Sequence, residues 1–148
     1  MAKRKIPAVF FNASVILAGM RSPMGGSGQI LQMGKKKQIK MLISEVIMDE
    51  VLRNAAKVGL TQAQITFSLQ DIFPKVSPAP DRALVKSFYQ ISVNVGDSHV
   101  LAACQENQAD FLVTLDKKHL LILQDKVTAF KIVSPGQLME MYNQQFKK

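Results

Sequence analysis

The stretch ADFLVTLD, residues 109–116, decides the fold class. Its centre, Phe111–Val113, is apolar at every position, which is typical of a strand buried on both faces. Similar short apolar runs predict three more strands, at Ala8–Phe11, Met41–Ile43 and Phe130–Val133. Strands of this kind occur mainly in parallel sheets that helices cover on both sides. The segments between the runs are therefore expected to form helices.

These segments carry helical patterns with recognisable ends. Ser44 is expected to cap a helix whose apolar spacing continues to a stop at Gly59. Thr61–Gln64 and Ser134–Gln137 both match the capping box that begins a helix. Two more helices are predicted at Gln29–Gln38 and at Asp97–Asn107, which is rich in alanine.

The alternation of strands and helices predicts a single-domain, three-layer α/β/α protein with a mostly parallel central sheet. The domain is expected to span residues 7–146, with a basic tail at 1–6 and a short tail at 147–148. The composition of Arg21–Gly28 predicts a loop, and Phe88–Val95 is predicted to contain a further strand.

The composition narrows the class of protein. The 148 residues include 19 Lys+Arg and 11 Asp+Glu, a net charge of +8 that favours a polyanionic partner. A lone cysteine, Cys104, excludes an internal disulfide framework and predicts a buried structural thiol. Because no apolar run approaches the ~20 residues of a membrane span and no signal peptide is expected, we expect a cytoplasmic protein without a membrane segment.

Several common chemistries are excluded by spacing. The glycines at 25–28 lack the third glycine of a dinucleotide fingerprint, and Gly34-Lys35 lacks the spacing and the hydroxyl of a phosphate-binding loop. The two histidines, His99 and His119, have no paired metal-ligand spacing and are predicted to be helix or loop residues rather than ligands.

Polar residues with oxygen-bearing side chains follow the predicted strands. In parallel α/β sheets such positions meet beyond the carboxyl ends of the strands, where ligands bind. Oxygen ligands suit magnesium or manganese. Each residue also has a structural interpretation: Asp97 as a helix cap, Asp116 as a turn residue and Glu50 as a solvated helix position. The candidate metal ligands of this kind are Asn12, Glu50, Asp97 and Asp116.

Five motifs in this order resemble the PIN-domain family, in particular the VapC-like toxins of toxin–antitoxin pairs. The resemblance covers about residues 7–142. Its most specific part is residues 109–116 with Leu120-Leu121. The other motifs lie at residues 8–17, at Met41–Ser44 leading to Asp49–Val51, at Asp97–Cys104 and at Val133–Pro135.

The resemblance implies a magnesium- or manganese-dependent ribonuclease, a phosphodiester hydrolase with an acidic quartet. Residue by residue, the quartet is Asn12, Glu50, Asp97 and Asp116, with Ser14 and Thr114 as hydroxyl partners. The family has Asp where this chain has Asn12, so the formal charge of the site falls from four negatives to three. An amide oxygen can still coordinate a cation, but metal affinity and activity are expected to be weakened or lost. The implied partners are RNA, an antitoxin protein and a second copy of the chain.

The expected roles follow from this assignment. Asp97 and Asp116 hold the metal, and Glu50 is a ligand or orients the water. Lys117 and Lys118 meet the phosphates of the substrate. Lys35 and Lys36, in the basic run at residues 35–37, extend this track or merely solvate the end of a helix.

Two other classes of function compete with the nuclease. A PIN fold that binds RNA or a protein partner without cleaving is favoured by Asn12, which removes a carboxylate. A receiver-like phosphoacceptor domain needs acidic residues near the first strand, and residues 8–14 contain none.

Overall fold

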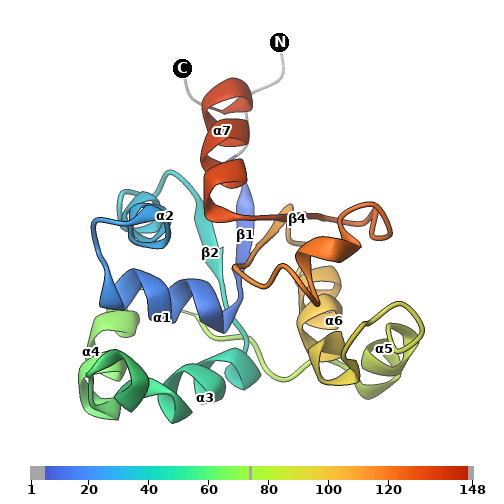
Figure 1. Ribbon diagram of the computed structural model, residues 1–148, viewed down its shortest axis with the longest axis horizontal. Coiled ribbons are helices and arrows are strands. Elements are labelled where there is room, and N and C mark those ends of the chain that lie inside the picture. The colour runs from blue at the N-terminus through green and yellow to red at the C-terminus, as the bar shows by residue number, and fades with distance from the viewer. Residues whose placement is uncertain (1–5, 74, 147–148) are drawn as a thin grey trace.

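The computed structural model describes residues 6–73 and 75–146 (Figure 1). Within these residues, four strands form one parallel sheet in the order β2-β1-β3-β4. The predicted fold class and the four strands predicted with it are confirmed. The strands are β1 (Ala8–Phe11), β2 (Lys40–Leu42), β3 (Phe111–Val113) and β4 (Lys131–Val133).

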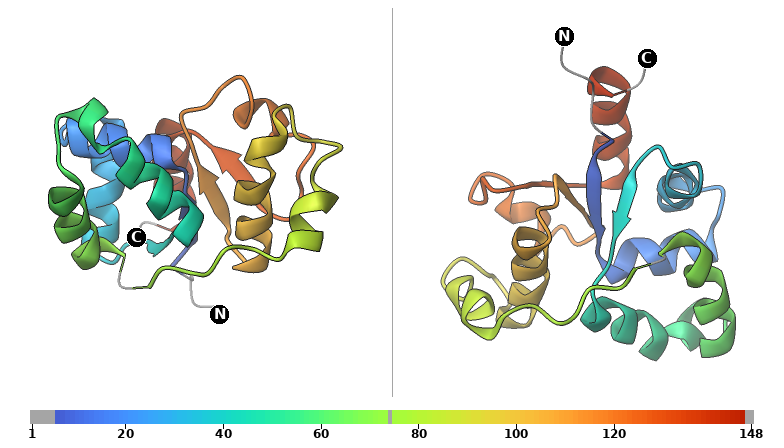
Figure 2. Two further views of the ribbon diagram at one scale, coloured as in Figure 1. Left: turned by 90° about the horizontal axis from the view of Figure 1, so that it is seen from below. Right: turned by 180° about the vertical axis from the view of Figure 1, so that it is seen from behind.

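Helices cover both faces of the sheet (Figure 2). On one face lies α6, with α5 packed against it. On the other face lie α1, α2 and α7, and α3 and α4 pack against α1 and α2. The helices of the described residues are α1 (Ala13–Arg21), α2 (Gly26–Lys35), α3 (Glu45–Arg53), α4 (Gln62–Ile72), α5 (Arg82–Ser87), α6 (Ser98–Glu106) and α7 (Pro135–Gln145), with short 3₁₀ helices η1 (Ala55–Val58), η2 (Val95–Asp97) and η3 (Leu121–Leu123).

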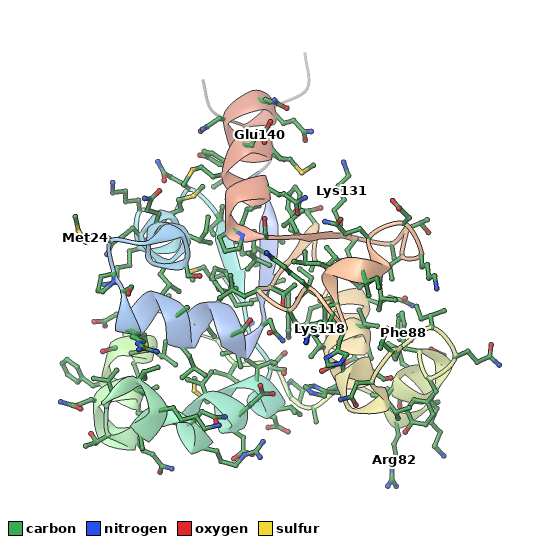
Figure 3. All side chains as sticks on the ribbon, viewed as in Figure 1. Met24, Arg82, Phe88, Lys118, Lys131 and Glu140 are labelled. Atoms are coloured by element: carbon green, nitrogen blue, oxygen red, sulfur yellow. The ribbon has the colours of Figure 1, made fainter. Side chains whose placement is uncertain are left out.

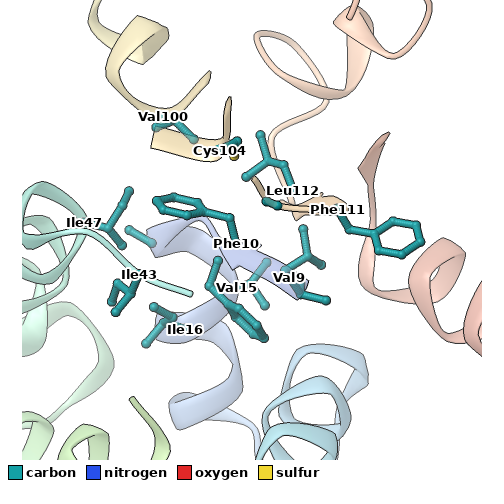
Figure 4. Close-up of a cluster of buried hydrophobic side chains, with 14 of the residues drawn as sticks. Val9, Phe10, Val15, Ile16, Ile43, Ile47, Val100, Cys104, Phe111 and Leu112 are labelled. Carbon is teal, nitrogen blue, oxygen red and sulfur yellow. The ribbon is translucent and has the colours of Figure 1, made fainter. Parts of the chain in front are cut away.

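The two central strands are buried on both faces, as their apolar sequences predict. In the register of the sheet, Phe10 lies opposite Leu112, and both side chains are fully buried. Figure 4 shows them beside Val100 and Cys104 of α6. Burial raises the pKa of the Cys104 thiol well above its usual range. The full burial of Cys104 confirms the predicted buried structural cysteine.

The predicted helix ends are also confirmed. The Oγ of Ser44 accepts the Ile47 N–H at 3.3 Å, and both capping boxes are formed. Gly59 ends the segment after α3 and η1 with a left-handed backbone, φ +74°. Local side-chain chemistry thus sets where the chain enters and leaves each layer.

The loop predicted at Arg21–Gly28 is present but shorter, confined to residues 22–25, because α1 runs to Arg21 and α2 begins at Gly26. Gly28 has a packing reason to be glycine: a Cβ there would lie 2.2 Å from the carbonyl oxygen of Pro23. The glycine permits close contact between α2 and the connection from α1. The glycine-rich composition therefore marks a tight corner between two helices rather than an open loop. The helix predicted at Gln29–Gln38 accordingly begins and ends three residues earlier, as α2.

The strand predicted within Phe88–Val95 is also wrong. After α5 the chain turns, and both the N–H and the Oγ of Ser92 donate to the Phe88 carbonyl, at 3.1 and 2.7 Å. Asn94 then caps η2 by accepting the Gly96 N–H. These local hydrogen bonds satisfy the backbone without a neighbouring strand. Phe88 is buried and anchors this loop, whereas Tyr89, Val93 and Val95 are exposed.

The tails expected at 1–6 and 147–148 lie outside the described residues, except for Ile6, which is exposed. Among the helices described, none has the length and apolar character needed to cross a bilayer.

Candidate metal centre

The ends of β1 and β3 bring residues from both ends of the chain together. These strands are neighbours, and the N–H of Asn12, just after β1, donates to the Val113 carbonyl at 3.1 Å. Thr114 follows β3 at the same edge. The Oγ1 of Thr114 donates to the Oδ1 of Asn12 at 3.2 Å, across 102 residues of chain. The carboxyl ends of the central strands are therefore joined by side chains.

Asn12 uses its amide oxygen inside the protein. Besides the bond from Thr114, Oδ1 accepts hydrogen bonds from the Oγ of Ser14 at 2.7 Å and from the Ser14 N–H at 3.4 Å. A backbone N–H can only donate, so these contacts fix which end of the amide carries the oxygen. The other end is an NH₂ group, which cannot ligate a cation. The amide oxygen of Asn12, which was expected to be a weakened metal ligand, therefore already accepts hydrogen bonds from three donors.

The hydroxyl groups of Ser14 and Thr114 also bind the backbone of the segment that follows β3. The Oγ of Ser14 accepts the Leu115 N–H at 3.2 Å, and the Oγ1 of Thr114 accepts the Asp116 N–H at 3.1 Å. Ser14 and Thr114 thereby connect Asn12 to the backbone that carries Asp116.

Asp116 divides its two oxygens between the backbone and the site. Oδ1 accepts the N–H groups of Lys118 and His119, at 3.1 and 2.9 Å. Oδ2 lies 3.2 Å from the Nδ1 of His119. The turn interpretation of Asp116 is therefore correct for one oxygen, while the second remains turned toward His119.

Asp97 lies where a helix cap is expected, at the start of α6, but its side chain forms no capping hydrogen bond. Its Oδ2 is buried and has no hydrogen-bond partner among the described residues. An unpaired buried carboxylate oxygen is costly, so such a group calls for a functional explanation. The capping interpretation of Asp97 is wrong.

Asp97, Asp116 and His119 converge. One potential ligand atom from each lies within 4.8 Å of the others. Burial is the largest cause that raises the pKa of Asp97, the Asp116 carboxylate raises it further, and His119 opposes both. Two carboxylates held this close repel each other unless a cation lies between them. Two carboxylates, one of them with an unpaired oxygen, and an imidazole together fit a divalent metal ion.

Glu50, on α3, faces this group but does not belong to it. Its pKa is raised mainly by burial; Arg53 lowers it and Asp97 raises it. The charges of Asp97 and Glu50 therefore interact, although Glu50 lies outside the group of converging ligand atoms. Of the expected quartet, the structure brings Asp97 and Asp116 together, places Glu50 at the margin and commits the oxygen of Asn12 to Ser14 and Thr114.

His119 is the residue that sequence reasoning missed. It was expected to be structural because neither histidine has a paired metal-ligand spacing. The available signal was its position three residues after Asp116, which in a tight turn brings the two side chains to the same side. His99 does not belong to this group: it is partly buried, its Nδ1 has no hydrogen-bond partner among the described residues, and burial lowers its pKa.

The lysines separate into two groups. Lys117 and Lys118 directly follow Asp116 and are exposed; Figure 3 shows Lys118 away from α2. Lys35 and Lys36 end α2, before the first residue of β2, and so lie at the opposite end of the parallel sheet. There Lys35 lines a hollow of about 620 Å³ together with Lys37, Lys40 and Lys75. Only the first pair lies beside the acidic residues.

The raised pKa of Asp97 carries a prediction for stability. Because the folded-state pKa exceeds the unfolded value, the folded state binds more protons, and the carboxylate costs stability as pH rises through that interval. We expect Asp97→Asn to raise the free energy of unfolding at pH 7 by about 0.5–1 kcal/mol, a figure discounted for partial exposure. The gain should vanish below about pH 4, where the unfolded carboxyl is also protonated.

Urea unfolding at several pH values measures this effect. The exposed Asp125→Asn serves as a control, in which the same chemical change should leave stability nearly constant. A destabilised Asp97→Asn protein at pH 7 would show that the carboxylate is a structural requirement.

The fold and the site define an α/β protein with converging carboxylates at the carboxyl edge of a parallel sheet, as in metal-dependent hydrolases of phosphate esters. Comparison with known families gives a match to the PIN domain over residues 8–118. The chain therefore belongs to the PIN-domain family. PIN domains are generally nucleases that use divalent metal and act on RNA. No curated protein matches the chain.

Proposed function

We propose that this protein is a metal-dependent endoribonuclease, the toxin of a toxin–antitoxin pair, whose activity is reduced by Asn12. The observation that carries the proposal is the convergence of Asp97 and Asp116, with an unpaired buried oxygen on Asp97. The toxin role rests on the resemblance of the motifs at residues 8–17 and 109–116. An antitoxin that covers the site and a homodimer are part of the same proposal.

Hydrolysis of a phosphodiester needs an activated water and neutralisation of the charge on the phosphoryl oxygens. A divalent ion, when bound, supplies both. The Oδ2 of Asp116 and the Oδ2 of Asp97 are the oxygens that would hold it. Asp116 is pre-oriented for this task, because its Oδ1 is fixed by two backbone N–H groups.

Glu50 is assigned to the water rather than to the metal, because it lies outside the group of ligand atoms. Burial raises the pKa of its carboxyl, which makes the carboxylate a better proton acceptor. Lys117 and Lys118 are assigned to the phosphates that flank the cleaved bond, where they make binding dependent on salt. Lys35 and Lys36 are left out because of their place at the other end of the sheet.

Digestion of single-stranded RNA by the purified full chain tests the proposal. We expect weak cleavage with manganese, complete loss with EDTA and recovery when manganese is added back. Cleavage that persists in EDTA would refute the metal mechanism. RNA binding without cleavage in any metal would favour the alternative, a PIN domain that binds RNA without cleaving it. The absence of a carboxylate at position 12 is the feature that favours this alternative.

A further inference from the structure

We propose that His119 is a third protein ligand of the metal in this site and makes the site prefer transition-metal ions such as cobalt or zinc over magnesium. The inference rests on the proposed function for the presence of a metal. It concerns a residue that the acidic quartet does not contain. It assigns to this chain a donor set of two carboxylates and one imidazole.

The spacing of the donors supports this assignment. Metal–nitrogen and metal–oxygen bonds of about 2.0–2.2 Å place neighbouring donors on one ion roughly 3.0–3.5 Å apart. The Nδ1 of His119 and the Oδ2 of Asp116 are 3.2 Å apart. The two atoms therefore already have the separation of neighbouring ligands, and Asp97 completes the group within 4.8 Å.

The backbone holds His119 in this position. Its N–H donates to the Oδ1 of Asp116, and the Leu121 N–H donates to the Asp116 carbonyl at 2.8 Å. Leu120, the next residue, is almost fully buried and anchors the turn in the core. The imidazole itself stays partly open, with 40% of its side chain exposed. A fixed but accessible imidazole next to a carboxylate is well placed to accept an ion from solvent.

The charge of the site explains why a nitrogen donor matters here. Asn12 contributes no carboxylate and its oxygen already accepts hydrogen bonds from Ser14 and Thr114, so the donors that converge here are two carboxylates and one imidazole. Magnesium prefers oxygen ligands in octahedral geometry, whereas imidazole suits zinc, nickel, iron and copper. Adding His119 to the donors raises affinity for transition metals and does little for magnesium.

The alternative is that His119 only orients Asp116 through their hydrogen bond. His119→Asn separates the two roles, because the asparagine amide can still donate to the Oδ2 of Asp116 but lacks the imidazole. Calorimetric titration of the full chain with cobalt and with magnesium is the measurement. We expect tighter binding of cobalt in the unmodified protein and a loss of about 10–100-fold in His119→Asn, with magnesium affinity changed less than about threefold. Lys126→Asn, at an exposed position, is the control for the substitution itself.

A direct spectroscopic measurement uses the fact that the chain has two histidines. Stoichiometric zinc should shift the imidazole nitrogen resonances of His119 and leave those of His99 in place. The inference is overturned if His119→Asn binds cobalt as tightly as the unmodified protein, if His119 does not respond to zinc, or if cobalt does not bind. A chain that keeps its preference for cobalt but cleaves no RNA in any metal refutes the nuclease proposal and leaves this one standing.

Discussion

Replacing Asp116 by asparagine is expected to lower manganese-dependent RNA cleavage by about 100-fold or more. The substitution removes a negative charge from the Oδ2 side while leaving an amide oxygen to accept the Lys118 and His119 N–H groups. The turn is therefore kept and only the metal ligand is weakened. Metal ions contribute several kcal/mol to transition-state stabilisation, and each 1.4 kcal/mol is about a factor of ten in rate.

Asp125→Asn is the matched control for this measurement, because Asp125 is exposed and outside the acidic group. It should retain full activity. Circular dichroism and urea unfolding establish that both variants are folded. Asp116→Asn with unchanged cleavage would remove Asp116 from the proposed site.

The opposite change, Asn12→Asp, is expected to raise manganese affinity and cleavage by about tenfold or more. One carboxylate oxygen can keep the hydrogen bonds from Ser14 and Thr114 that the amide oxygen now accepts. The second oxygen then takes the place of the NH₂ group and returns the fourth negative charge. Calorimetry with manganese and RNA digestion in parallel measure both effects.

The same variant should lose stability without metal at neutral pH, because Asn12 is only 8% exposed and a further carboxylate there is poorly solvated. Added manganese should restore the stability of the Asn12→Asp protein, because the metal binds only the folded state. Asn143→Asp introduces the same charge at an exposed position of α7 and should change neither property. Equal metal affinity of the Asn12→Asp and unmodified proteins would show that position 12 lies outside the metal's reach.

Much of the fold could be predicted because local rules and tertiary packing agree. Phe10 and Leu112 lie in uninterrupted apolar runs, and the central strands that carry them are buried on both faces. Ser44, Thr61 and Ser134 cap helices through bonds that span three residues, so the sequence contains the whole interaction.

The segments that were predicted wrongly depend on contacts that sequence spacing does not contain. Gly28 lies in α2, where the close approach of the Pro23 backbone leaves no room for a Cβ, but its glycine neighbours make the composition look like a loop. The apolar residues of Phe88–Val95 alternate like those of a strand, but bonds from Ser92 and Asn94 turn the chain instead. In both cases a tertiary or side-chain contact overrides the local pattern.

The candidate site was predictable to the extent that it follows strand ends. Asp116 follows β3 as predicted, whereas Asp97 reaches the site from the start of α6, and the described residues contain no strand directly before it. The meeting of His119 with them depends on the turn after Asp116, and the commitment of the Asn12 oxygen depends on Ser14 and Thr114. Spacing rules for metal ligands do not describe either arrangement. Lys35 and Lys36 show the same limit, since charge alone does not tell at which end of a sheet a residue lies.

The hydrogen bond between Asn12 and Thr114 has a consequence for biosynthesis. Its partners are 102 residues apart, so β1 is synthesised long before β3, the second of the two strands that it pairs with. At translation speeds of about 5–20 residues per second, this delay is roughly 5–20 s. The candidate metal centre is complete only when the segment containing Asp116 and His119 has emerged and docked beside β1. The acidic group is therefore assembled late, after the chain between β1 and β3 has been synthesised.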